Sequence, residues 1–332
     1  MDYHRLPKID LHCHLDGSVR PTTIIDLAIA QNIELPSYDV NELKRWLVVD
    51  ENCQSLSEYL QRFELPLKVL QTTEAIERVT YELYEDAASE NVKYLEVRFG
   101  PQLHRVNGLS YQQIFAAVKA GLSKAVQNLD IKGNVIISML KHLSVESMHE
   151  VLEQVQPFVG DPIVGFDLAG AENPGFAQQY VDVCDKARRL GLNITIHAGE
   201  QGDSQNVVDA VSLLKAQRIG HGLALMKRTS DIDFVRNNIT SIETCPTSNT
   251  QTKAVDSLAK HPLPQMLQQR LPVSINTDNR TVSNTTMTKE VEKVFKQFAL
   301  TKETYATIYQ SSINACFADD QVKAWLSSRV DS

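Results

Sequence analysis

Two histidines near the amino terminus stand at a spacing that suits a metal ion. His12 and His14 are two residues apart in LHCHLDG, and side chains two apart on a β-strand point to the same face. Both imidazoles can therefore reach one ion. Cys13 points to the opposite face by the same alternation, so we expect it to pack against a helix. A lone HxH is a weak signal, and its weight depends on what accompanies it.

Three further polar residues lie at the ends of later predicted strands: His197 in HAGE, His221 in GHG and Asp278 in NTDN. Three neutral imidazoles and one carboxylate suit a borderline divalent cation such as zinc, with a position left open for water. Because five candidate groups exceed the usual four protein ligands, one of them could be a catalytic base, and the spacing does not say which. Barrels with two metal ions commonly bridge them with a modified lysine at the end of the fourth strand. Here that predicted strand ends in FDLAG without a lysine, which favours one ion per chain.

Carboxylates near these residues could serve the same site. Glu200 lies three residues beyond His197, in the loop that leaves the fifth predicted strand. A carboxyl group beside a metal ion can carry a proton, but a glutamate here can equally be a first-turn acid of a helix. Glu243 on the seventh predicted strand could support a metal-bound histidine, with Arg98 as its counter-ion or as a pocket wall.

Eight short apolar runs alternate with longer amphipathic stretches along the chain. Runs of this kind are typical of parallel strands that are buried on both faces. The pattern predicts an α/β fold, a (β/α)8 TIM barrel, as one domain over 1–332. The polar residues at the carboxyl ends of the runs lie where a TIM barrel has its active site. The runs cover 8–14, 92–99, 134–140, 163–170, 193–199, 218–222, 241–245 and 272–278.

The segment between the first two runs, from residue 14 to residue 92, is longer than one connecting helix requires. We expect extra helices there, over the barrel mouth. Leu60, Phe63 and Leu67 would share one face of such a helix, so they are expected either to pack in the core or to line a substrate pocket.

Composition limits the possible partners and the compartment. The 332 residues include 33 Lys+Arg against 41 Asp+Glu, for a net charge of −8, which gives no footprint for a nucleic acid polymer. The five cysteines form no CxxC, so neither a disulfide framework nor a thiolate zinc site is predicted. No signal peptide or membrane span is predicted either. We expect a cytoplasmic protein that acts on a small molecule, with no membrane and no obligate protein partner.

Five motifs, HxHLDG, DLAG, HAGE, RIGHG and NTD, resemble the adenosine deaminase family in their order and approximate spacing, over almost the whole chain. The resemblance implies a TIM-barrel hydrolase that converts adenosine and 2′-deoxyadenosine to inosine or deoxyinosine and ammonia, in purine nucleoside salvage. It also implies one zinc ion per chain, held by His12, His14, His197 and Asp278.

The resemblance also assigns roles to the residues around the ion. His221 would be the base that orients and deprotonates the attacking water, and Glu200 would give a proton to ring nitrogen 1 of the purine. The N–H of Gly170 would donate to ring nitrogen 3, and Asp16 would accept from the ribose 5′-hydroxyl. His14 would border the substrate as well as the ion.

Asn279 is a departure from the family pattern, which commonly has a second aspartate after the metal ligand. That aspartate contacts ring nitrogen 7, an acceptor, so it must be protonated to donate, whereas an asparagine amide donates at any pH. We expect Asn279 to keep the contact and activity to tolerate alkaline pH. The alternative is an asparagine that caps the following loop.

Other functions remain open on these motifs. Adenine deaminases share all the metal motifs but commonly carry glutamate in place of Asp16, and the shorter aspartate leaves room for a ribose. Deaminases of methylated AMP or of aminofutalosine resemble the same motifs. A non-catalytic purine-binding barrel is a third alternative, but it would not need Glu200 beside a metal.

Overall fold

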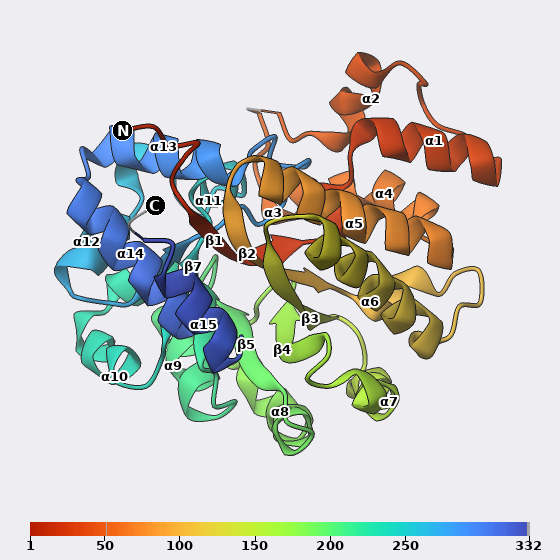
Figure 1. Cartoon of the computed structure of the whole chain (residues 1–332). Coiled ribbons are helices and arrows are strands. Elements are labelled where there is room, and N and C mark those ends of the chain that lie inside the picture. Colours follow the sequence, from red (N-terminus) through yellow and green to blue (C-terminus); the bar gives the residue numbers. More distant parts are fainter. Residues whose placement is uncertain (51, 331–332) are drawn as a thin grey trace.

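A ring of eight parallel strands forms the centre of the computed structural model, which describes residues 1–50 and 52–330 (Figure 1). Each strand pairs with the next one in chain order, so the predicted TIM barrel is confirmed. The strands are β1 (Lys8–His14), β2 (Val92–Phe99), β3 (Lys132–Leu140), β4 (Ile163–Ala169), β5 (Asn193–Ala198), β6 (Arg218–His221), β7 (Ser241–Thr244) and β8 (Val273–Ile275).

The seam between the first and last strands closes the ring through Asp278. The Asp278 N–H donates to the His12 carbonyl at 2.8 Å, and the His14 N–H donates to the Asp278 carbonyl at 2.7 Å. Cys13 and Asp278 thereby form a parallel bridge outside the named strands. The residues that close the barrel are therefore the residues that were predicted to hold a metal ion, or their direct neighbours.

The last strand is shorter than predicted, because it ends at Ile275 and not at Asp278. The side chain of Asn276 accepts a hydrogen bond from Leu11 N at 2.9 Å and donates one to Thr244 O at 3.1 Å, so it bridges both neighbouring strands. Asp278 follows with a φ of 59°, in the left-handed region where short polar residues are tolerated.

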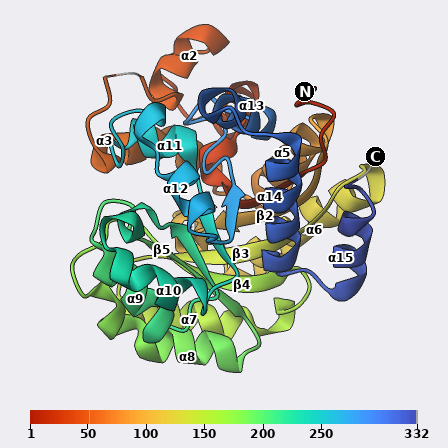
Figure 2. The ribbon, with the colours of Figure 1, turned by 90° about the vertical axis from the view of Figure 1, so that its left-hand side faces the viewer.

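Helices surround the barrel and fill the long connection after β1, as predicted. Helices α1 to α5 lie in that connection, and α2 stands out from the rest of the molecule in Figures 1 and 2. The helices are α1 (Pro21–Gln31), α2 (Val40–Leu47), α3 (Leu56–Leu60), α4 (Glu64–Val69), α5 (Thr73–Ser89), α6 (Tyr111–Asn128), α7 (Val145–Gln154), α8 (Val181–Arg189), α9 (Ser204–Ser212), α10 (Ile232–Arg236), α11 (Pro246–Gln251), α12 (Leu263–Gln268), α13 (Met287–Phe298), α14 (Lys302–Ala315) and α15 (Asp320–Ser327).

The single helical face expected for Leu60, Phe63 and Leu67 is wrong in detail. Leu60 ends α3, Phe63 ends a 3-10 turn (Gln61–Phe63), and Leu67 belongs to α4. Pro66 has no N–H to donate, so one regular helix cannot run through this segment. The tighter turn nevertheless leaves all three side chains on the wall of one cavity.

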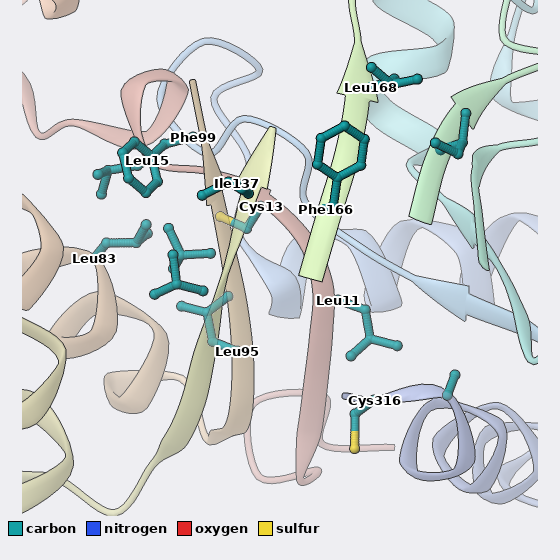
Figure 3. Packing of buried hydrophobic residues seen from close by; sticks show 14 of the residues in the cluster. Leu11, Cys13, Leu15, Leu83, Leu95, Phe99, Ile137, Phe166, Leu168 and Cys316 are labelled. Carbon is teal, nitrogen blue, oxygen red and sulfur yellow. The ribbon is translucent and has the colours of Figure 1, made fainter. Parts of the chain in front are cut away.

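The core lies between the strands and the outer helices, where the apolar side chains of β1 are buried. Figure 3 shows Cys13 of β1 and Leu95 of β2 on the same side of the strands as Leu83 of α5. Burial raises the pKa of the Cys13 thiol to about 12, so it packs as a neutral group, away from the face that carries His12 and His14. All five cysteines are buried and unbridged.

Membrane-spanning helices are absent from the part of the chain that the structure describes: none combines the necessary length with the necessary apolar character.

Candidate active site

The five predicted polar residues at the strand ends converge at one end of the barrel. The Asp278 carboxylate lies 3.6 Å from His12 Nε2 and 3.4 Å from His14 Nε2. The ring of His197 is centred 4.5 Å from that of His12, and the ring of His221 is centred 4.9 Å from it. Ligand atoms of His12, His197 and His221 lie within 4.8 Å of one another, and so do those of His12, Cys245 and Asp278. His12 is common to both groups.

Two of the histidines are oriented by carboxylates behind them. His12 Nδ1 donates to Glu243 at 2.8 Å, and His197 Nδ1 donates to Asp167 at 2.9 Å. In each neutral ring the lone pair is therefore on Nε2, which faces the other histidines. Carboxylates placed in this way fix the tautomer of metal-binding histidines.

His12 Nε2 shows that the cluster of His12, His14, His197 and Asp278 fits a cation. This atom is buried and has no hydrogen-bond partner among the described residues. Burial would lower the pKa of His12, but Asp278 and Glu243 outweigh it and raise that pKa. The position therefore favours positive charge, which a divalent ion would supply in place of a proton. Burial lowers the pKa of His197 to about 3, so this ring is a neutral ligand.

A network of buried charges supports the cluster from below. Burial alone would raise the pKa of Glu243, but Arg98 and Arg218 hold it well below its usual range. Arg98 lies 2.7 Å from Glu243 and 3.2 Å from Asp167, and Arg218 lies 2.7 Å from Glu243 and 2.6 Å from Glu96. Glu243 thus does support a histidine with Arg98 as its counter-ion, an arrangement that the sequence analysis left open.

Glu200 and His221 face each other beside the cluster. Glu200 Oε2 lies 3.8 Å from His221 Nε2. The other oxygen, Oε1, accepts a hydrogen bond from Thr252 Oγ1 at 3.0 Å, so the carboxyl group is held with one oxygen toward His221. Thr252 is a residue that the sequence analysis did not single out.

A cavity of about 430 Å³ opens above the cluster. Its floor includes His14, His197, Glu200, His221 and Asp278. Asp16, Gly170 and Asn279 border it, so the structure brings the predicted substrate contacts to the same space as the predicted ligands. Much of its wall is apolar and comes from Leu56, Leu60, Phe63, Leu67, Leu103 and Phe176.

The residues that border the cavity are prepared for polar contacts. Asp16 Oδ1 is buried without a hydrogen-bond partner, and burial raises the pKa of this carboxyl to about 6. Gly170 has a φ of +88° and nothing within 4 Å of the place where a Cβ would stand, so its backbone is open to the cavity. Asn279 packs against Gly17, where any added methyl group would overlap the amide.

Comparisons with known proteins give the same assignment as the motifs. A family model described as Adenosine deaminase matches residues 7–332. The chain belongs to the adenosine deaminase family. A protein from Vibrio vulnificus named adenosine deaminase is 54% identical over 99% of this chain and 99% of its own length.

Solved structures of related enzymes share this barrel. An adenine deaminase from Arthrobacter aurescens is 29% identical, with a TM-score of 0.90 over 98% of both chains. An amidohydrolase from Burkholderia ambifaria with bound Zn is 25% identical, with a TM-score of 0.89 over 99% of this chain and 92% of the other. The chain is thus a hydrolytic deaminase of a metal-dependent family.

Glu172 supports the loop that carries Glu200, and the sequence analysis did not single it out. Burial alone would raise the pKa of its carboxyl, but Lys141 and backbone N–H donors outweigh burial and lower it. The only available signal was a carboxylate two residues beyond DLAG, at the rim where TIM barrels have their active site. Its oxygens accept hydrogen bonds from the N–H groups of Gly199 (2.9 Å), Glu200 (2.7 Å), Gln201 (3.1 Å) and Gly202 (3.2 Å) and from Asn206 Nδ2 (3.0 Å).

Proposed function

We propose that this barrel catalyses the hydrolytic deamination of adenosine and 2′-deoxyadenosine to inosine or deoxyinosine and ammonia. It would work as a single catalytic domain with one zinc ion per chain, in cytoplasmic purine nucleoside salvage. The single observation that carries the proposal is the convergence of Glu200, His221 and the histidine cluster on the floor of one cavity. Five unbridged cysteines suit a reducing compartment.

The zinc ligands in this proposal are His12, His14, His197 and Asp278. The orphaned Nε2 of His12 and the Nε2 of His197 both face the shared position. When bound, zinc lowers the pKa of a water molecule and supplies a nucleophile near neutral pH. Asp167 and Glu243 contribute by holding the imidazoles of His197 and His12 in the ligating tautomer.

Glu200 supplies the acid in this mechanism. It gives a proton to ring nitrogen 1, which makes carbon 6 of the purine more electrophilic. Thr252 and Glu172 hold it in place, the first through the side chain and the second through the Glu200 N–H. His221, whose Nε2 lies 3.8 Å from Glu200 Oε2, orients the attacking water.

Three polar groups set the position of the nucleoside. Asp16, a carboxyl with an unpaired oxygen at the edge of the cavity, accepts from the ribose 5′-hydroxyl. The N–H of Gly170 donates to ring nitrogen 3, and the amide of Asn279 donates to ring nitrogen 7. The apolar wall formed by Leu60 and Phe63 excludes water around the base.

Adenine deamination is the second candidate function, because the similar Arthrobacter structure is named an adenine deaminase. Asp16 favours the nucleoside, since its short side chain leaves space for a sugar. The test is the fall in purine absorbance with adenosine, 2′-deoxyadenosine and free adenine in parallel, with zinc assayed on the same sample. Turnover of the nucleosides with adenine untouched would support the proposal.

Turnover of adenine alone would assign the chain to base deamination. A zinc-loaded protein that acts on none of the three compounds would retain the metal site and refute the substrate, and methylated or phosphorylated 6-aminopurines would then be assayed. Asp16→Glu provides a matched variant, since it should weaken nucleoside turnover by crowding the sugar and leave zinc content unchanged.

A further inference from the structure

Behind His221 runs a buried chain of hydrogen bonds that leads away from the cavity. His221 Nδ1 lies 2.9 Å from Asn249 Nδ2, and Asn249 Oδ1 lies 3.2 Å from His261 Nε2. His261 Nδ1 lies 3.2 Å from the N–H of Leu263. His221, Asn249 and His261 are all at most 1% exposed.

Two backbone N–H groups fix the direction of every bond in this chain, because a backbone N–H can only donate. Leu263 N–H donates to His261 Nδ1, so the proton of that neutral ring is on Nε2 and is donated to Asn249 Oδ1. Cys245 N–H also points at Asn249 Oδ1, at 3.4 Å. The reverse orientation of the amide would place its NH₂ group against two donors.

The electrostatics of His261 keep this arrangement at neutral pH. Burial is the main cause and the neighbouring His221 a second one, and together they lower the pKa of His261 to about 4. The ring therefore holds a single proton, and the backbone donor at Leu263 determines which nitrogen carries it.

This orientation of Asn249 determines the tautomer of His221. Asn249 must present its NH₂ group to His221 Nδ1, so Nδ1 accepts and a neutral His221 carries its proton on Nε2. That nitrogen is the one that faces the cavity floor, 3.8 Å from Glu200 Oε2. We propose that His221 acts as a hydrogen-bond donor to the oxygen that attacks carbon 6, not as the base that deprotonates it, and that Asn249 and His261 are the positioning residues that impose this tautomer.

The protons balance without a basic His221, given the proposed deamination. Glu200 as carboxylate takes one proton from the attacking water and delivers it to ring nitrogen 1 while the oxygen bonds to carbon 6. Glu200 then takes the remaining proton from that oxygen and passes it to the amino group. The bond from carbon 6 to nitrogen breaks, ammonia leaves, and the product keeps the proton on nitrogen 1. His221 donates to the oxygen throughout and keeps its own proton.

The direct test is the protonation of the two ring nitrogens of His221. Long-range proton–nitrogen correlation spectra of the ¹⁵N-histidine-labelled, zinc-loaded protein separate the tautomers, and a His221→Gln sample identifies the signals. We expect an unprotonated Nδ1 and a protonated Nε2. A protonated Nδ1 with a bare Nε2 would overturn the proposal, whatever the substrate proves to be, so its failure is distinct from that of the proposed function.

Two variants at Asn249 give opposite orders of activity under the two mechanisms. Asn249→Asp is isosteric and accepts from Nδ1–H, so it imposes the tautomer with a bare Nε2, whereas Asn249→Leu imposes neither. At a pH where His221 is neutral, we expect kcat to fall roughly 100-fold in the aspartate variant, the usual cost of one lost oxyanion donor, and less in the leucine variant. Zinc content should stay unchanged in both.

An aspartate variant that is as active as the wild type, or more active than the leucine variant, would show that His221 is a base and refute the proposal. Asn107→Asp, at an exposed turn and not among the residues that line the cavity, is the control for adding a carboxylate. Because the ring spectra are recorded on the unmutated protein, poor folding of a variant would leave the direct test intact.

Discussion

Replacing Glu172 by glutamine should slow turnover although Glu172 does not line the cavity. The carboxylate receives five hydrogen bonds, of which Oε1 accepts three from the N–H groups of Glu200, Gln201 and Gly202. Oε2 accepts the other two, from Gly199 N–H and Asn206 Nδ2. Glutamine can keep its oxygen on the first group, but its NH₂ group then faces two donors.

The expected cost follows from those two lost bonds. Hydrogen bonds to a charged group contribute about 1.5–3 kcal/mol each. Because Glu172 is only half-buried, water can replace part of the loss, so we take the low end and expect about 3 kcal/mol. That is roughly 100-fold in the equilibrium between a Glu200 loop in place and a displaced loop. We therefore expect kcat to fall between about 10-fold and about 100-fold.

The assay compares kcat, zinc content and the melting temperature of the Glu172→Gln protein with those of the wild type. Zinc content should not change, since His197 is oriented by Asp167 and not by this loop. The pKa of Glu172 lies below its ordinary value, so the ionised carboxylate stabilises the folded protein above the pKa of Glu172 in the unfolded chain. This contribution to the free energy of unfolding is lost as the pH falls through the pKa of Glu172 in the folded protein. The melting temperature of the variant should therefore decrease less on acidification than that of the wild type.

Glu34→Gln is the matched control, because Glu34 is exposed and should leave kcat and the melting temperature unaltered. Wild-type kcat in Glu172→Gln would refute the reasoning, since it would mean that the five hydrogen bonds do not hold Glu200 during turnover. A loss of zinc would refute it as well, because the effect would then arise at the ligands.

Four other substitutions test separate parts of the site and the fold. Glu200→Gln should keep zinc and lose most of kcat, whereas His12→Asn should lose both. The zinc content and kcat of each variant are measured on the same sample. Loss of zinc in the Glu200 variant would contradict the role of Glu200 as acid. Asn279→Asp should lose kcat/KM as the pH rises, because a carboxyl must be protonated to donate, and equal pH profiles would remove the idea. Burial lowers the pKa of His104 to about 4, so the free energy of unfolding decreases as the pH falls from the pKa of His104 in the unfolded chain toward 4. Between about pH 7 and about pH 5, His104→Asn should lose about 2 kcal/mol less of this free energy than the wild type, as measured by denaturation. If His104→Asn loses as much as the exposed control His4→Asn, this role of His104 is refuted.

The strands and the histidine cluster were predictable from local pattern. Parallel strands buried on both faces are continuous apolar runs, and the eight predicted runs end within a few residues of the observed strands. The strand ends of a TIM barrel meet at one rim, so His12, His197 and Asp278 could be brought together from their positions alone. The predicted end of β8 was wrong because the side chain of Asn276 bonds the backbone of both neighbouring strands where β8 ends. The apolar pattern of the sequence does not show these bonds.

The supporting residues were not predictable, since their partners are remote in the sequence. Glu172 holds a loop that follows a different strand, and nothing around it in the sequence marks it as a hydrogen-bond acceptor for that loop. Asn249 and His261 belong to segments without catalytic motifs, and only the fold reveals their line of contacts to His221. The 3-10 turn at Gln61–Phe63 shows a further limit, because helical periodicity does not record where a regular helix must stop.

The seam at Asp278 also sets the order in which the site can come into being. A ribosome would release His12 and His14 long before Asp278, whose backbone closes the ring against them. The nascent chain therefore offers an ion two histidines without their carboxylate partner for most of its synthesis. Ion capture and ring closure become one late event, and a chain that stops after β7 would lose both together.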